Sequence, residues 1–180
     1  MGAAARCDCV SGATRSSSAS SLGRPSSSRA HRNALAALSR DAKTLVFFGT
    51  GGSSLGGQTL AQLGGWGIPG DDGNGQHGRP RTRFYDNLDG GTLQALLAAT
   101  DFKKTRFIVT SKSGGTVETL AQAIATISAI QAAGLGDHIP SLFLGITEPD
   151  MPGRSNGLRA LFQSLSIPLL EHHTGIGGRF

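Results

Sequence analysis

Two short segments rich in glycine and hydroxyl side chains have the composition of an anion-binding site. They are GTGGSSLGG at 49–57 and SKSGGT at 111–116, and each lies between an apolar run and a stretch with helical spacing. Glycines let backbone N–H groups approach an anion without a Cβ in the way, and serine and threonine hydroxyls add donors. A helix that begins there presents free N–H groups and a partial positive charge. The chemistry that these residues favour is the binding of a phosphate group.

The elements that must position these segments alternate along the chain. We expect strands at 43–49, 82–87, 105–110, 141–147 and 167–171, and helices at 54–65, 91–100, 115–134 and 156–165. Residues 65–80 are rich in turn-forming residues and are expected to be a loop. Strict alternation of strand and helix predicts a doubly wound α/β fold, in which five parallel strands are flanked by helices on both faces.

The strand order decides whether the two segments meet. In the flavodoxin-like order 2-1-3-4-5, the first and third strands are neighbours whose connections leave in opposite directions, so that their carboxyl ends open a crevice. Both glycine-serine turns then face one pocket. The side chains that we expect to supply donors or charge there are those of Ser53, Ser111, Lys112, Ser113 and Thr116.

Composition and charge narrow the classes of partner. The 180 residues suit one domain, 38% of them are hydrophobic, and no apolar run approaches the roughly 18 residues of a membrane span. The net charge of +5 lies in residues 1–40, where six arginines face a single aspartate, whereas residues 41–180 carry eleven basic and eleven acidic side chains. We therefore expect neither a nucleic-acid partner nor a membrane partner for the domain.

Residues 1–40 differ from the rest of the chain. Residues 11–28 contain nine serines and almost nothing to bury, so we expect a disordered Ser/Arg-rich leader, with a short helix at 31–40 leading into a domain at 41–180. An arginine-rich, acid-poor start fits an organelle transit peptide. It also fits a mis-set start codon or a non-native leader, which is the interpretation we favour.

The sequence gives no reason to expect a metal or a cofactor. The two cysteines, Cys7 and Cys9, lie in the leader without enough neighbouring ligands, and a domain without cysteine is compatible with a reducing cytoplasm. The first glycine segment lacks the dinucleotide spacing G-x-G-x-x-G, because Ser54 stands where the glycine three residues after Gly51 is required. A small phosphorylated sugar fits these turns better than a nucleotide.

Four segments in order, FFGTGGSSLGG, SKSGGTVETLAQA, ITEP and HHTGIGGRF, resemble motifs of the glucose-6-phosphate isomerases, particularly the bacterial ones. SKSGGT alone resembles the broader sugar isomerase (SIS) domain. The resemblance covers about 41–180 and does not extend to 1–40. It implies a cytoplasmic, homodimeric enzyme of glycolysis and gluconeogenesis that interconverts glucose 6-phosphate and fructose 6-phosphate through an enediolate.

The resemblance also implies roles for individual residues. Ser53, with Gly52, falls beside the substrate, and Arg179 falls on the arginine that stabilises the enediolate. Glu118 matches a family position as well, although an acid in the first turn of a helix is also ordinary dipole compensation. The phosphate cradle falls on Ser111, Lys112 (mostly through its backbone), Ser113 and Thr116.

The resemblance places the family's catalytic base downstream of the "GGR" signature, beyond Phe180. We therefore expect an N-terminal fragment of an isomerase, which binds hexose 6-phosphate with little turnover. His172 and His173 follow a predicted strand and match no proton-transfer position of the family. The alternative is a non-catalytic sugar-phosphate-binding SIS module of a regulator. Such regulators normally carry a helix-turn-helix segment ahead of the domain, and residues 1–40 show no pattern for one.

Overall fold

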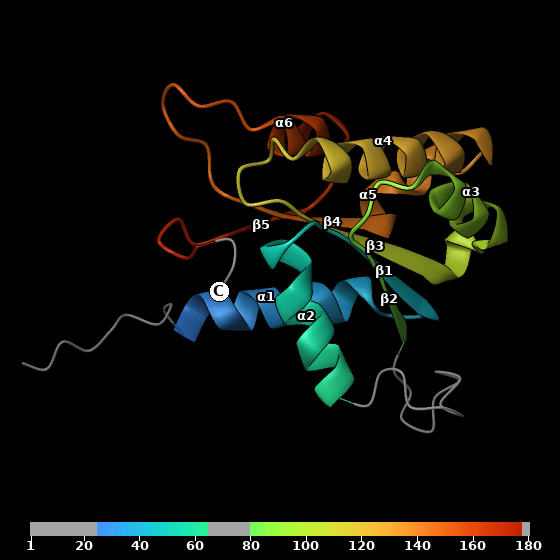
Figure 1. Cartoon of the computed structure of the whole chain (residues 1–180), viewed down its shortest axis with the longest axis horizontal. Coiled ribbons are helices and arrows are strands. Elements are labelled where there is room, and N and C mark those ends of the chain that lie inside the picture. Colours follow the sequence, from blue (N-terminus) through green and yellow to red (C-terminus); the bar gives the residue numbers. More distant parts are fainter. Residues whose placement is uncertain (1–24, 65–79, 178–180) are drawn as a thin grey trace, which may run out of the picture.

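The fold is a single parallel sheet with helices on both faces. The computed structural model describes residues 25–64 and 80–177. All recorded strand pairs are parallel, and the strand order is β2-β1-β3-β4-β5 (Figure 1), which confirms the expected fold class and order. The strands are β1 (Thr44–Phe48), β2 (Arg81–Tyr85), β3 (Thr105–Thr110), β4 (Phe143–Thr147) and β5 (Leu169–Glu171).

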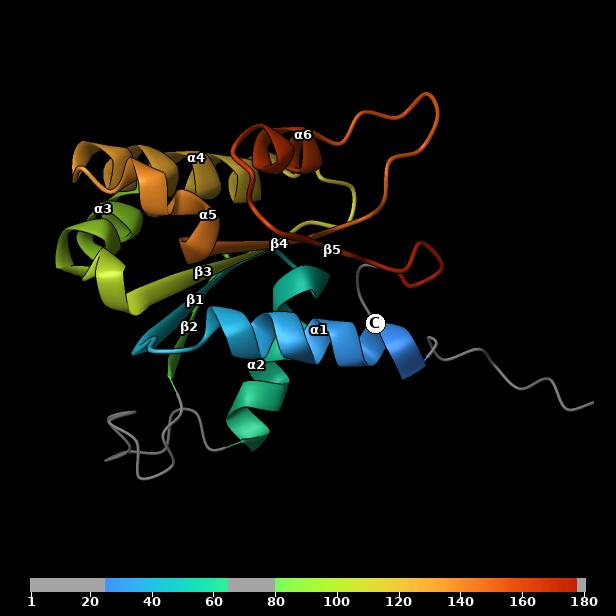
Figure 2. The same ribbon diagram turned by 180° about the vertical axis from the view of Figure 1, so that it is seen from behind.

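The helices divide between the two faces of the sheet. In Figures 1 and 2, α3, α4 and α6 lie over one face, and α1 and α2 lie on the other. No helix in the described ranges is long and apolar enough to cross a membrane. The helices are α1 (Pro25–Leu38), α2 (Gly52–Leu63), α3 (Gly90–Ala99), α4 (Val117–Ala132), α5 (Ile139–Leu142) and α6 (Gly157–Ser164), with 3₁₀ turns η1 (Phe102–Lys104) and η2 (Gly136–His138).

Helix α1 corrects one expectation. It begins at Pro25 and ends at Leu38, so the short helix expected at 31–40 starts six residues earlier, and the disorder expected for the leader is wrong for 25–30. Proline is favoured at the first position of a helix, and the alanines, leucines and arginines that follow are good helix formers. Residues 1–24 and 65–79 lie outside the described residues, and with them most of the expected leader and loop.

The start of β4 differs from its expected position as well. The predicted strand at 141–147 begins only at Phe143, because α5 occupies the two residues before it. Pro140 stands in the first turn of α5, where its missing N–H costs no helical hydrogen bond. The apolar run therefore changes from helix to strand at Leu142, within what looked like one strand.

An aromatic row across the middle of the sheet forms the centre of the core. Phe107 of β3 is fully buried, and its ring centroid lies 5.9 Å from that of Phe48 and 5.0 Å from that of Phe143. Phe143 in turn contacts Phe162 of α6, edge to face, at 6.1 Å. The central strands are thus apolar because neighbouring strands and covering helices both pack on them.

The cap of α3 gives a pH-dependent prediction. The Asp89 carboxylate accepts hydrogen bonds from the Thr92 hydroxyl and from the Thr92 backbone N–H, the latter at 2.9 Å. The Thr92 side chain, followed by the Thr92 backbone, holds the pKa of Asp89 below its ordinary value of 3.8. A carboxylate with a lowered pKa stabilises the folded state above its unfolded pKa, and this stabilisation is lost as the pH falls through the folded value.

We therefore expect Asp89→Asn to keep a capping side chain and to lose this dependence on pH. The difference in unfolding free energy between the wild type and the variant should be constant from pH 7 to pH 5 and should shrink as the pH falls below 3.8. Urea denaturation of both proteins at pH 7 and pH 3 measures this difference in unfolding free energy. A difference of the same size at both values would contradict the role of the carboxylate charge.

Candidate functional site

The two glycine-serine loops are neighbours at the carboxyl ends of β1 and β3. These strands pair in parallel from Thr44↔Thr105 to Phe48↔Val109. Immediately beyond this pairing, Gly49 lies against the end of β3, because a Cβ at Gly49 would stand 3.2 Å from the carbonyl oxygen of Thr110. The strand order therefore brings the loop before α2 and the loop before α4 together, as the sequence predicts.

In the first loop, the two serines have different surroundings. Gly51 takes a φ of 54° ahead of α2, a conformation that favours glycine. Ser54 is buried, and its hydroxyl accepts a hydrogen bond of 2.7 Å from Gln58, which also donates to Asp86 at 3.0 Å. Ser53 is half-buried, and no described residue hydrogen-bonds its hydroxyl. Gln58 therefore links α2 to the segment after β2 and also engages the Ser54 hydroxyl, whereas the Ser53 hydroxyl has no partner among the described residues.

In the second loop, two predicted site residues contact each other. The Ser111 side chain is almost fully buried, and its hydroxyl donates to Thr116 Oγ1 at 3.1 Å. Thr116 precedes α4, and no side-chain cap satisfies the N–H groups of that helix's first turn. The N-terminus of α4 thus presents free donors and a partial positive charge beside the Ser111–Thr116 pair, an arrangement suited to an anion.

Gly114 fixes the shape of the second loop. Its φ is 67°, and a Cβ at this position would overlap the side chain of Asn156. The Gly114 carbonyl accepts a hydrogen bond of 2.9 Å from Leu158 N, so the loop is tied to the first turn of α6. Ser113 Oγ accepts a hydrogen bond of 3.3 Å from Gly115 N, which orders the turn locally.

Asn156 is a residue that the sequence reasoning missed. Its Oδ1 caps α6 by accepting from Arg159 N at 2.9 Å, and its Nδ2 donates to Thr147 Oγ1 at 2.8 Å and to Glu148 O at 3.1 Å. One amide thus joins the end of β4, the start of α6 and the glycine of the second loop. The sequence signal was an asparagine at the first position of the predicted helix 156–165, the end of a helix where capping side chains are preferred.

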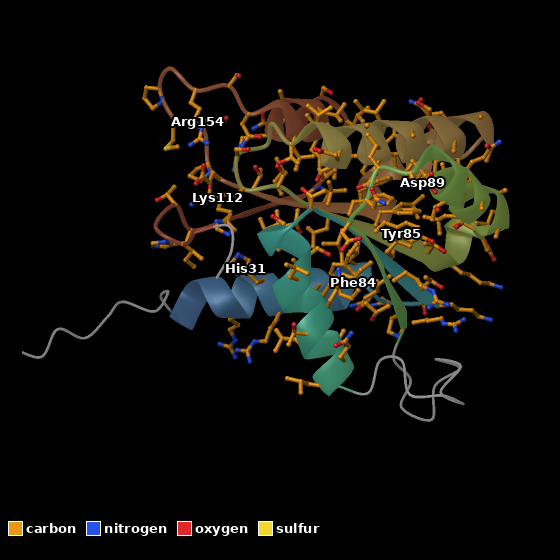
Figure 3. The ribbon with its side chains drawn as sticks, viewed as in Figure 1. His31, Phe84, Tyr85, Asp89, Lys112 and Arg154 are labelled. Carbon is orange, nitrogen blue, oxygen red and sulfur yellow. The ribbon has the colours of Figure 1, made fainter. Side chains whose placement is uncertain are left out.

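The Lys112 side chain is engaged within the protein. Its Nζ lies 3.6 Å from Glu148 Oε1 and donates to the carbonyl oxygens of Thr174 (3.2 Å) and Ile176 (2.5 Å). Glu148 is 6% exposed, and its other oxygen accepts from Arg154 Nη1 at 3.2 Å; Figure 3 shows Lys112 and Arg154 at the same end of the sheet. Lys112 therefore ties the segment after β5 to the second loop. Glu148, which the sequence reasoning did not single out, follows a buried strand directly.

The remaining predicted residues fall at or beyond the end of β5. His172 N donates to Thr147 O at 2.8 Å, and His173 Nδ1 accepts from Gly175 N at 3.1 Å, so both residues hold the turn that leads toward Arg179. Arg179 itself lies outside the described residues, and its role stays a prediction.

The fold and loops define a class of protein: a doubly wound parallel α/β domain with paired glycine-serine loops at the switch point of the sheet. No family model matches the chain. The glucose-6-phosphate isomerase of Aromatoleum aromaticum is 40% identical over 94 residues, which are 52% of this chain and 16% of that protein. The probable glucose-6-phosphate isomerase of Haloquadratum walsbyi is 29% identical over 140 residues, which are 78% of this chain and 29% of that protein.

A solved structure that is similar to this chain carries the same protein name as these relatives. The glucose-6-phosphate isomerase of Chlamydia trachomatis superposes with a TM-score of 0.66 at 26% identity, over 86% of this chain and 26% of that protein. The chain is thus similar to proteins named glucose-6-phosphate isomerase, and it spans less than a third of the length of each of these three.

Proposed function

We propose that the two loops bind the phosphate group of a hexose 6-phosphate, and that this domain serves an aldose–ketose isomerase of the glucose-6-phosphate isomerase type. The observation that carries the proposal is the contact between the Ser111 and Thr116 hydroxyls beside the uncapped N-terminus of α4. The names of the relatives support the choice of substrate. The sugar-phosphate-binding unit in this proposal is residues 41–180.

Each predicted residue has one task in this proposal. The hydroxyls of Ser111, Ser113 and Thr116 and the backbone of Lys112 donate to the phosphate oxygens. Gly52 and Ser53, on the neighbouring loop, lie beside the sugar carbons. Because the phosphate is remote from the reacting carbons, its binding energy positions C1 and C2 for reaction.

The reaction moves a proton between C2 and C1 of the open-chain sugar through an enediolate. Negative charge develops on the sugar oxygen as the C–H proton leaves, and a fixed positive charge nearby stabilises it. We assign that task to Arg179. The contacts of Lys112 with the carbonyl oxygens of Thr174 and Ile176 support this assignment, because they hold the segment before Arg179 close to the phosphate loop. The proposed enzyme is cytoplasmic and homodimeric, and uses no metal or cofactor.

Replacing Ser111 by alanine tests the phosphate cradle. We expect Ser111→Ala, and separately Thr116→Ala, to weaken binding of glucose 6-phosphate about 10- to 150-fold, because a hydrogen bond to a charged group contributes roughly 1.5–3 kcal/mol. Isothermal titration calorimetry measures the effect, and unphosphorylated glucose serves as the second ligand. Ser128→Ala is the matched control, because Ser128 is an exposed serine of α4 away from the loop, and its loss should leave binding unchanged. Equal binding of glucose and glucose 6-phosphate to the wild type would refute the proposal.

A further inference from the structure

A second concave site lies at the opposite end of the sheet from the two loops. A cavity of about 480 Å³ opens at the amino ends of β1, β2 and β3 and is partly covered by the last turns of α3. Four of its lining side chains are cations: Lys43 before β1, Arg81 and Arg83 of β2, and Lys104 of η1. The site thus gathers positive charge from three separate segments of the chain.

That charge is only partly compensated. Asp101 is the one acid that lines the cavity; its carboxylate lies 3.7 Å from Lys104 Nζ and accepts from Lys103 N at 3.1 Å. No described carboxylate pairs with Lys43, Arg81 or Arg83. Cations grouped in a concave site with one carboxylate focus the field and raise the local concentration of anions.

The backbone holds the cations in place. Lys43 N donates to Lys104 O at 2.8 Å, and Arg81 N donates to Lys43 O at 2.7 Å, so the three segments are hydrogen-bonded to one another at the mouth of the site. Arg81 and Arg83 share one face of β2, because side chains alternate along a strand. Phe84, on the other face, stacks on Phe47 at 4.9 Å. The pairing of β2 and this ring contact therefore fix the backbone positions from which the two arginine side chains extend.

The size and lining of the cavity indicate the kind of ligand. Its volume falls within the roughly 300–1,000 Å³ typical of small-molecule sites, which is far more than one inorganic phosphate fills. Leu96 and Ala99 of α3 supply an apolar wall beside the cations. Guanidinium groups bind phosphate through paired N–H donors. We propose that this cavity binds a small organic molecule bearing two or more phosphate groups.

This site is distinct from the sugar-phosphate loops. Thr105, at the start of β3, lines the cavity, whereas Ser111 follows the end of the same six-residue strand. A strand of that length separates them by about 20 Å. A ligand in the cavity therefore contacts none of the residues assigned to the hexose phosphate.

Titration calorimetry on the full chain at low salt tests the inference with three probes: ADP, fructose 1,6-bisphosphate and inorganic pyrophosphate. We expect at least one organic probe to bind more tightly than pyrophosphate, and Arg81→Gln/Arg83→Gln to weaken it by about tenfold or more. Lys103→Gln is the matched control, since it removes an adjacent exposed charge that does not line the cavity, and its effect should stay below about twofold. Should the double variant fail to fold, Lys43→Gln/Lys104→Gln makes the same test.

Tighter binding of ADP would identify a nucleotide ligand, and tighter binding of fructose 1,6-bisphosphate a sugar ligand; either supports the inference. Pyrophosphate binding as tightly as both would overturn it, because the apolar wall would then contribute nothing. An equal loss in Lys103→Gln would also overturn it, as would loss of the same binding in Ser111→Ala. The last result would place the probe in the phosphate loop, and the glucose 6-phosphate titration would still report on that loop separately.

Discussion

A Gly114→Ala variant should lose about 2–5 kcal/mol of unfolding free energy. The left-handed φ of 67° costs a residue with a Cβ roughly 1–2 kcal/mol, and the added methyl group overlaps Asn156, which costs about 1–3 kcal/mol more as the packing shifts. Asn156 cannot move freely, because its amide caps α6 and bonds to Thr147 and Glu148. Urea denaturation, monitored by far-UV circular dichroism, measures the loss.

Gly115→Ala is the control for this variant. The Gly115 φ lies outside the left-handed region, and a Cβ there would have Ser113 Oγ as its nearest contact, at 3.9 Å. Its unfolding free energy should change by less than about 1 kcal/mol. The loss in a Gly114→Ala/Asn156→Ala double variant should be smaller than the sum of the losses in the two single variants, since the overlap disappears with the Asn156 side chain while the strain stays. Equal stability of the two glycine variants would show that the loop does not take this shape.

A Phe107→Ala variant is expected to lose about 3–5 kcal/mol, the range for removal of a fully buried aromatic ring. Phe107 lies between Phe48 and Phe143 in the aromatic row, so its removal leaves a cavity that neither ring can fill without leaving its own strand. Thermal and urea unfolding of the variant and the wild type, each with a test of reversibility, measure this loss of unfolding free energy.

Leu60→Ala provides the comparison, because Leu60 of α2 is 72% exposed and its loss should change the unfolding free energy by no more than about 0.5 kcal/mol. Phe107→Leu keeps most of the volume and should cost less than about 1.5 kcal/mol. If Phe107→Ala and Leu60→Ala had equal stability, the core would not lie where the aromatic row places it.

Most of the fold could be predicted from local sequence. The apolar runs that end in glycine or serine became β1 and β3 with bounds within a residue of those expected, because strands buried on both faces are almost continuously apolar. Helix α5 was missed because an apolar run of this length fits either a strand or a buried helix. Helix α1 was partly missed because the three serines at 26–28, which lie in its first turn, suggested disorder.

Only the part of the candidate site that lies within one sequence motif could be predicted from the sequence. Ser111 and Thr116 lie in one loop, so their contact is local. Asn156 and Glu148 come from the segment after β4, so their contacts with the second loop exist only once β4 has paired with β3. The cationic cavity could not be predicted from the sequence, for a different reason. The domain has equal numbers of acidic and basic residues, so the sequence totals conceal how the strand order gathers the basic ones.

The position of β1 between β2 and β3 has a consequence for how the protein is made. Thr44 pairs with Arg81 of β2 and with Thr105 of β3, which are 37 and 61 positions further along the chain. At about 5–20 residues per second, a ribosome completes the second of these intervals in roughly 3–12 s. Throughout that time the aromatic run of β1 lacks at least one of the two strands that flank it. The nascent chain therefore offers a chaperone an exposed apolar segment, and the sheet assembles around β1 only after β3 has been translated.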